Sequence, residues 1–206
     1  MTRKKFPGWA IALIAVLVIV LIGGVAVIGP YNTMVGYDEQ VSTAQANIQT
    51  QLQSRLDKIN ELMPAVQGSM NQEDDIYKDI AALRSNTPGI NMDADGKLTI
   101  DKNASIKELE NADAASSQMI RDINIAQEAY PELKSSDLMK DFMTSVEGIE
   151  NRISYARDNY NEDVQAYNVY IRSFPHNIAA SLFGFSPKEK FEASSAAQNA
   201  PVVKFD

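Results

Sequence analysis

The chain has 206 residues, no cysteine, one histidine and a formal net charge of −8. Without cysteine it cannot form disulfides, Cys-ligated zinc sites, iron–sulfur clusters or thiol nucleophiles. The single histidine, His176, leaves little scope for imidazole catalysis, and we expect it in a surface or capping position at a helix end. The acidic balance also argues against nucleic acid as a partner, because phosphates bind basic surfaces.

Residues 9–29 predict a single N-terminal transmembrane helix. The uninterrupted apolar run from Trp9 to Ile28 has the length that crosses the hydrocarbon core of a bilayer. It is longer than the core of a cleaved signal peptide and ends at a poor cleavage site, so we expect the segment to be retained. Basic residues at positions 3–5 precede it, and such residues tend to stay inside. Residues 1–8 are therefore predicted to be cytoplasmic and the bulk of the chain extracytoplasmic.

A helical bundle domain is predicted over residues 31–185. In its first helix, about 31–85, buried-type residues recur every 11 positions, or three turns of 3.67 residues, which favours a nearly straight helix. The third helix, about 136–173, repeats this period, so the two helices are predicted to pack along their length. The rows of the first helix are Val41, Leu52, Met63; Ile48, Ile59, Met70; and Ala44, Arg55, Val66; those of the third are Leu138, Ile149, Tyr160, Ile171 and Phe142, Ile153, Val164.

Between these helices, residues 88–101 predict a small β-hairpin around an Asp-Gly turn. The same residues allow a second interpretation, because Asn91, Asp93 and Asp95 occupy the first, third and fifth positions of a calcium loop of the EF-hand type. The twelfth position, which should be a bidentate glutamate, is Lys102, and a cation there repels a metal ion. The hairpin is therefore favoured over a cation site.

Two further helices complete the predicted domain. The second helix is expected over 103–129 with Asn103 as its N-cap, and a short helix over 177–184 follows the break at Phe174 and Pro175. With helices that alternate in direction, the short helix would cap the bundle far from the bilayer; a return of Phe183 and Phe185 to the membrane surface is the alternative. Residues 186–206 are expected to form an extended tail.

The predicted fold class is therefore all-α: one transmembrane helix, an antiparallel bundle of three long helices, a short C-terminal helix and a hairpin insertion between the first two helices. Arg55 breaks the apolar pattern, and a charge on that face must be paired or reach solvent along its stem. Our hypothesis is an ion pair between Arg55 and an acid of the third helix, either Glu147, Glu150 or Asp163, that fixes the register of the two helices.

Blocks of residues along most of the chain are similar to those of one family. The chain resembles the LemA family of bacterial membrane proteins, which implies one transmembrane helix, a helical bundle and a place in the bacterial cell membrane, with no established reaction, substrate or cofactor. Within or beside the matching blocks, Arg55, Glu150, Tyr160, Phe174 and Pro175 are assigned structural roles. The blocks are Tyr31-Asn32, Gln51-Leu52, Glu128 to Lys134, Glu150 to Ile153, Ala156 to Asn161, Tyr167-Asn168, Arg172 to Pro175, Leu182 to Phe185 and Ala200 to Phe205.

Two classes of function fit these features. The favoured one is a membrane-anchored, extracytoplasmic helical scaffold or protein-interaction module of the bacterial envelope, without catalytic residues, metal or cofactor. Its expected partners are the lipid bilayer, through residues 9–29, other envelope or membrane proteins, and a second copy of the chain. The alternative is a cell-envelope enzyme that uses paired carboxylates, or a sensor of a ligand or divalent cation. Acids at helical spacing usually form a solvated face, so none is assigned to catalysis.

Overall fold

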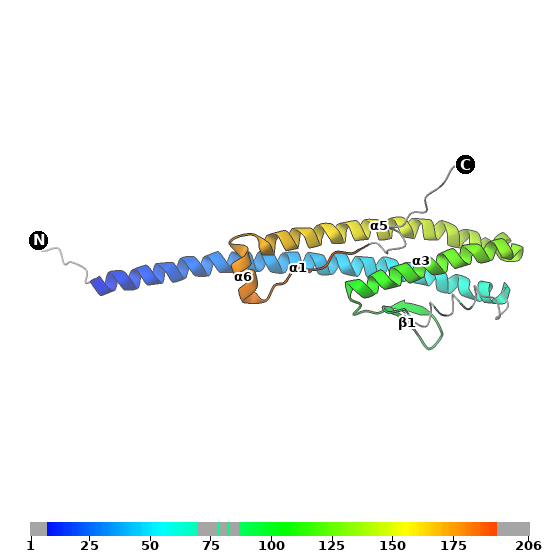
Figure 1. Cartoon of the computed structure of the whole chain (residues 1–206), viewed down its shortest axis with the longest axis horizontal. Coiled ribbons are helices and arrows are strands. Elements are labelled where there is room, and N and C mark those ends of the chain that lie inside the picture. Colours follow the sequence, from blue (N-terminus) through cyan, green and yellow to red (C-terminus); the bar gives the residue numbers. More distant parts are fainter. Residues whose placement is uncertain (1–7, 70–77, 79–81, 83–86, 193–206) are drawn as a thin grey trace, which may run out of the picture. The chain divides into compact units, whose positions relative to one another are not determined.

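The computed structural model describes residues 8–69, 78, 82 and 87–192. These residues are mostly α-helical, as the all-α prediction requires, with one two-stranded hairpin. The described elements are α1 (Gly8–Ser69), β1 (Ile90–Met92), β2 (Leu98–Ile100), α3 (Ile106–Ala129), α4 (Pro131–Ser135), α5 (Asp137–Arg172) and α6 (His176–Phe183), as labelled in Figure 1. The chain divides into two compact units, residues 1–41 with 163–188 and residues 42–162 with 189–206.

The rows that repeat every 11 residues form the buried core. Their members on α1 are buried from Val41 to Val66, and those on α5 from Phe142 to Ile171, with Leu138 half-buried. Met70 lies outside the described residues. Because each apolar side chain removed from water contributes about 25 cal/mol per Å², this shared stripe is a main source of stability.

The second unit corrects the predicted directions of the helices. The amides of Gln45 and Gln49 donate to the backbone carbonyls of Ala104 and Asp101, at 3.0 and 2.7 Å, and Asn60 pairs with Leu98. The segment 98–104 therefore runs antiparallel to α1. This extended segment leads the chain back along α1. Helix α3 therefore starts beside the middle of α1 and runs parallel to it.

Of the long helices described in the second unit, α5 runs antiparallel to α1 and α3 does not, so the predicted alternation of three antiparallel helices is wrong. Contacts along α1 fix this direction. Lys58 and Leu62 lie beside Leu138, near the start of α5, whereas Asn47 lies beside residues 151–159 further along that helix. The hairpin and the segment after it thus carry the chain back along α1, and this sets the direction of α3.

Helix α3 begins later than predicted because a better cap lies nearby. Ser105, and not Asn103, is the N-cap: its hydroxyl accepts from the Glu108 backbone N–H, and the Glu108 carboxylate accepts from the Ser105 backbone N–H in return. The Ser105 hydroxyl also donates to the Glu108 carboxylate at 2.7 Å, and this bond, together with the one from the Ser105 N–H, lowers the pKa of Glu108. The one-turn helix α4 was not predicted, although Pro131 at its first position suits a helix start.

Three asparagines hold extended chain against helices in the same way. In the second unit, Asn60 donates to the Leu98 carbonyl and accepts from the Leu98 N–H, both at 2.9 Å, and Asn161 does the same with Phe191 at 3.1 and 2.8 Å. In the first unit, Asn168 pairs with Lys188 at 2.8 and 2.9 Å. Each side-chain amide takes the place of the peptide group of a neighbouring strand, so backbone that would otherwise lack a partner is satisfied.

The first unit is held together by aromatic contacts. The Tyr37 and Tyr170 ring centroids lie 5.3 Å apart, and His176 stacks on Tyr170 at 4.1 Å. The Tyr31 ring meets Phe183 edge-on, at 4.8 Å between centroids, and Phe185 lies at 5.9 Å. The predicted position of the short helix, far from the anchor, is therefore wrong: α6 packs beside Tyr31, which follows the predicted anchor by two residues.

Within the described part of the chain, none of the helices has a stretch that is both long and apolar enough to cross a membrane. The predicted anchor at residues 9–29 falls partly outside that description, since the side chains of Ile11 and of residues 19–27 are not described.

Candidate functional site

The most unusual site in the second unit is built around a buried arginine. Arg55 occupies the middle of the row formed by Ala44 and Val66 on α1, and its side chain is 0% exposed. An unpaired charge at such a position would cost several kcal/mol, so the guanidinium requires partners from the elements packed against it.

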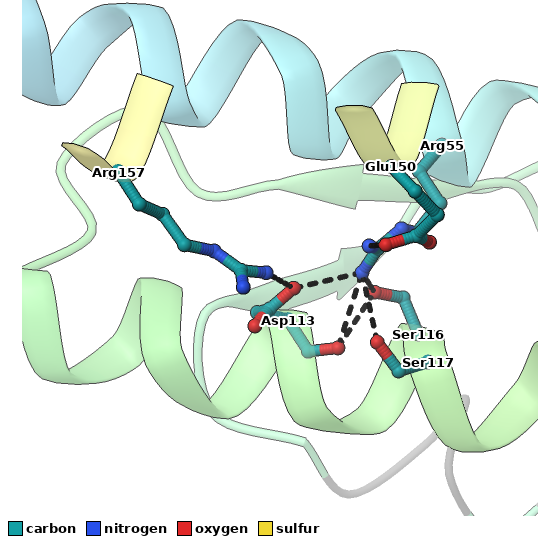
Figure 2. A network of polar contacts seen from close by, with 6 residues as sticks. All are labelled: Arg55, Asp113, Ser116, Ser117, Glu150 and Arg157. Atoms are coloured by element: carbon teal, nitrogen blue, oxygen red, sulfur yellow. Dashed lines mark hydrogen bonds and ion pairs between the residues drawn. The ribbon is translucent and has the colours of Figure 1, made fainter. Parts of the chain in front are cut away.

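Residues of α3 and α5 supply these partners (Figure 2). Arg55 Nη1 donates to the Asp113 carboxylate at 2.8 Å, to the Asp113 carbonyl at 3.2 Å, and to the hydroxyls of Ser116 and Ser117 at 2.9 and 3.1 Å. Its Nη2 forms an ion pair with Glu150 of α5. The ion pair between Arg55 and an acid of the third predicted helix is therefore present, and one side chain joins three helices.

A second arginine shares the same acid. Arg157 of α5 forms an ion pair with the Asp113 carboxylate oxygen that Arg55 also contacts, and its guanidinium lies 5.1 Å from the centre of the Phe191 ring. Two guanidinium groups and two carboxylates thus cancel in formal charge. The aromatic face adds a cation–π contact on the open side of Arg157, whose side chain is one-quarter exposed.

Tyr160 belongs to the same stretch of α5 but contacts the tail. Its ring is buried, and its hydroxyl donates to the Glu189 carbonyl at 2.9 Å. Burial raises the pKa of Tyr160 to about 12, and the negative charges of Glu110 and Glu189 add to that effect. Tyr160 is therefore a neutral hydrogen-bond donor and not a base.

The remaining residues that the sequence singled out lie apart from this network. Phe174 is 81% exposed, Pro175 is the residue before α6, and the ring of His176 is stacked in the first unit. In the hairpin, Asp93 accepts hydrogen bonds from the backbone N–H groups of Asp95 and Lys97, so its carboxylate closes the turn. The described residues contain no group of three or more His, Cys, Asp or Glu side chains placed to hold a metal ion.

Comparison with known proteins identifies the family of this chain. The model of the LemA family matches residues 44–205, which include every residue of the buried network. The chain belongs to the LemA family. It is also similar to the magnetosome proteins MamQ 1 and MamQ 2 of Paramagnetospirillum magneticum, each 26% identical over 98% of this chain and 79% of the relative. A magnetosome protein MamQ of Magnetospirillum gryphiswaldense is 32% identical over 52% of this chain and 39% of its own length.

Two open polar grooves mark the surface of this LemA-family chain in its second unit. The first, of about 850 Å³, lies between α1 and the hairpin, but its amides are engaged: Gln49 and Gln53 bond the backbone of Asp101 and Ile100. The second, of about 390 Å³, lies between α1 and α5 around the exposed Tyr155. Its polar side chains make no hydrogen bond or ion pair within the described residues; they are Asn47, Gln51, Asn151, Arg152, Tyr155 and Asn159.

Asp113, Ser116, Ser117 and Arg157 were not predicted to belong to the network (Figure 2). The partner of Arg55 was expected on the third predicted helix, because that helix shares the 11-residue period of the first. Asp113, the acid that both arginines use, lies on α3 next to Ala112 and one turn before Ser116, within a stripe of small buried residues. Asp113 is an acid on the apolar face of its helix, as Arg55 is a base on the apolar face of α1. This pattern of opposite charges could have indicated the pair from sequence.

We expect Asp113→Ala to destabilise the folded chain by about 3 kcal/mol, because it leaves two arginines without the carboxylate they share. Urea unfolding of the full chain in detergent, followed by circular dichroism, measures this difference. Asp113→Asn, which keeps the shape but removes the charge, should lose less. Asp158→Ala, at an exposed position on α5, should stay within about 0.5 kcal/mol of the wild type. Equal losses at positions 113 and 158 would show that the network contributes nothing.

The raised pKa of Tyr160 predicts a loss of stability at high pH. An unfolded tyrosine has a pKa of about 10, so the folded state binds the phenol proton more tightly than the unfolded state does. The stability that this contributes is fully present below about pH 10. The contribution is lost as pH rises through the folded pKa of about 12. Unfolding free energies at successive pH values above 9 should therefore fall more steeply for the wild type than for Tyr160→Phe. Tyr155→Phe, at an exposed ring, should keep the wild-type slope.

Proposed function

We propose that this LemA-family protein is anchored in a bacterial membrane by residues 9–29 and acts outside the cytoplasm as a non-catalytic scaffold or interaction module. The observation that carries this proposal is the surface of the first part of α1. Trp9, Leu13, Ile14 and Leu17 are each between 58 and 69% exposed, on a helix that continues unbroken to Ser69. Side chains of this size facing water in every direction are unfavourable, and the interior of a bilayer covers them.

The chemistry of the second unit supports binding and not catalysis. Asp113 and Glu150, the acids of the buried network, are both held by arginines, so neither is available as a general acid or base. By contrast, the groove around Tyr155 presents amides, a phenol and a guanidinium without partners in the described chain, which suits recognition of another molecule. The relatives are magnetosome proteins by name, and these names indicate no reaction.

The direction of insertion follows from charge. The only basic residues before Arg55 are those at positions 3–5, and cations that flank a first transmembrane helix tend to stay in the cytoplasm. The acidic domain then lies on the opposite side.

Because the chain has no cysteine, single thiols report topology without background. We expect Asn111→Cys, at an exposed position on α3, to react with a membrane-impermeant maleimide in cells whose inner membrane is intact. Thr2→Cys should react only after lysis. Labelling is read by mass shift on a gel, after permeabilisation of any outer membrane. The opposite pattern would reverse the orientation, and labelling of both before lysis would refute the span.

The scaffold role predicts a defined neighbour at the groove around Tyr155. A benzoyl-phenylalanine photo-crosslinker at position 155 in living cells should give an adduct of discrete mass with another envelope protein, identified by mass spectrometry. The same group at exposed Asn111 is the control and should not give that adduct. Illumination without any adduct specific to position 155 would count against recognition of a protein partner at this groove.

A further inference from the structure

The region around α6 in the first unit carries a second apolar surface. Phe174 is 81% exposed, Ile178 61%, Leu182 71% and Phe183 46%. The helix buries Ala179 and Ala180, on the side away from Ile178 and Leu182, and the half-exposed Phe183 lies on that same side, against Tyr31. We call Phe174, Ile178, Leu182 and Phe183 the α6 patch. Four large apolar side chains on one short helix and the turn before it are more than scattered surface residues, and such a patch normally meets a partner.

The α6 patch lies beside the end of the proposed anchor. Phe183 and Phe185 pack on Tyr31, with ring centroids 4.8 and 5.9 Å away. Tyr31 follows the proposed span by two residues of a continuous helix, which is a rise of about 3 Å at 1.5 Å per residue. With residues 9–29 across the bilayer, as proposed, the edge of the α6 patch would lie where hydrocarbon gives way to headgroups.

The residues beside the patch have the chemistry of that boundary. Tyrosine is enriched where membranes meet water because its ring is apolar and its hydroxyl polar, and Tyr31 contacts Phe183 at the edge of the patch. The exposed Arg172, at the end of α5, adds a cation that suits lipid phosphates. An apolar helix face flanked by such residues is typical of a helix that lies in a membrane surface.

We propose that α6 is a second membrane contact: the α6 patch inserts into the interfacial layer of the same bilayer that holds the proposed anchor. Residues 9–29 then fix the chain across the membrane, while α6 fixes the first unit against its surface. A second copy of the chain and a protein partner are the competing occupants, but the contact with Tyr31 favours lipid. This inference rests on the proposed anchor, and it deepens that function by assigning a lipid-binding surface outside the span.

Fluorescence quenching in a reconstituted membrane tests the proposal. The full chain carries one thiol, labelled with the environment-sensitive dye NBD, in nanodiscs of phosphatidylcholine and phosphatidylglycerol that contain lipids with a doxyl quencher near the headgroup. At Ile178→Cys, we expect the quencher to reduce emission about twofold or more, with a blue-shifted spectrum, as for a side chain in the interface. Ile125→Cys is the matched control, because Ile125 is similarly exposed, at 56%, but lies on α3.

A third label separates failure of this inference from failure of the anchor. NBD at Ile14→Cys should be quenched by lipids whose doxyl group lies deep in the acyl chain. Quenching at position 14 with none at 178 beyond that of 125 would overturn the role of α6 and leave the span intact. A blue shift at 178 without quenching would also overturn it, in favour of a protein that covers the patch. Absence of quenching at position 14 would refute the anchor itself.

Discussion

The second unit depends on how one buried charge is satisfied. Arg55 stands where the pattern of α1 calls for an apolar side chain, and its two nitrogens reach Asp113 on α3 and Glu150 on α5. Rows of apolar side chains alone allow two packed helices to shift in register by whole turns, because similar side chains recur along each row. An arginine with partners on two different helices removes that freedom, since any other register leaves an ion in a dry core. A satisfied polar network of this kind specifies a single arrangement of the core.

Outside the helices, the fold is held by amides and not by sheets. The hairpin has only two short strands, and residues 186–192, the part of the tail that the structure describes, form none. Asn60, Asn161 and Asn168 nevertheless pair with extended backbone as a strand would, each through both of its polar groups. An asparagine on a helix offers one donor and one acceptor at the spacing of a peptide group. This lets a helical protein position β-like segments without the cost of building a sheet.

Much of the fold was readable from sequence because helical periodicity is a local property. The rows spaced by 11 identified the buried faces of α1 and α5, and Asp95-Gly96 marked the hairpin turn. Direction was not readable, because whether α3 runs with or against α1 depends on where the segment 98–104 docks, and that is decided by Gln45, Gln49 and Asn60 at long range. The same error displaced α6, since its place beside Tyr31 follows from the path of the whole chain. In the network, Glu150 was foreseen because it lies on a strongly periodic helix, whereas Asp113 lies on a helix of small residues with a weak pattern.

The 11-residue spacing also bears on how such proteins change size during evolution. Three turns of helix return a side chain to the same angular position, so an insertion of 11 residues in α1 matched by one in α5 lengthens both helices by about 16 Å while every existing contact keeps its face. Insertions of other lengths rotate the core toward water. Family members with helices of different length can therefore arise by insertion of 11-residue units, each three helical turns, while the ionic cluster around Arg55 keeps its contacts.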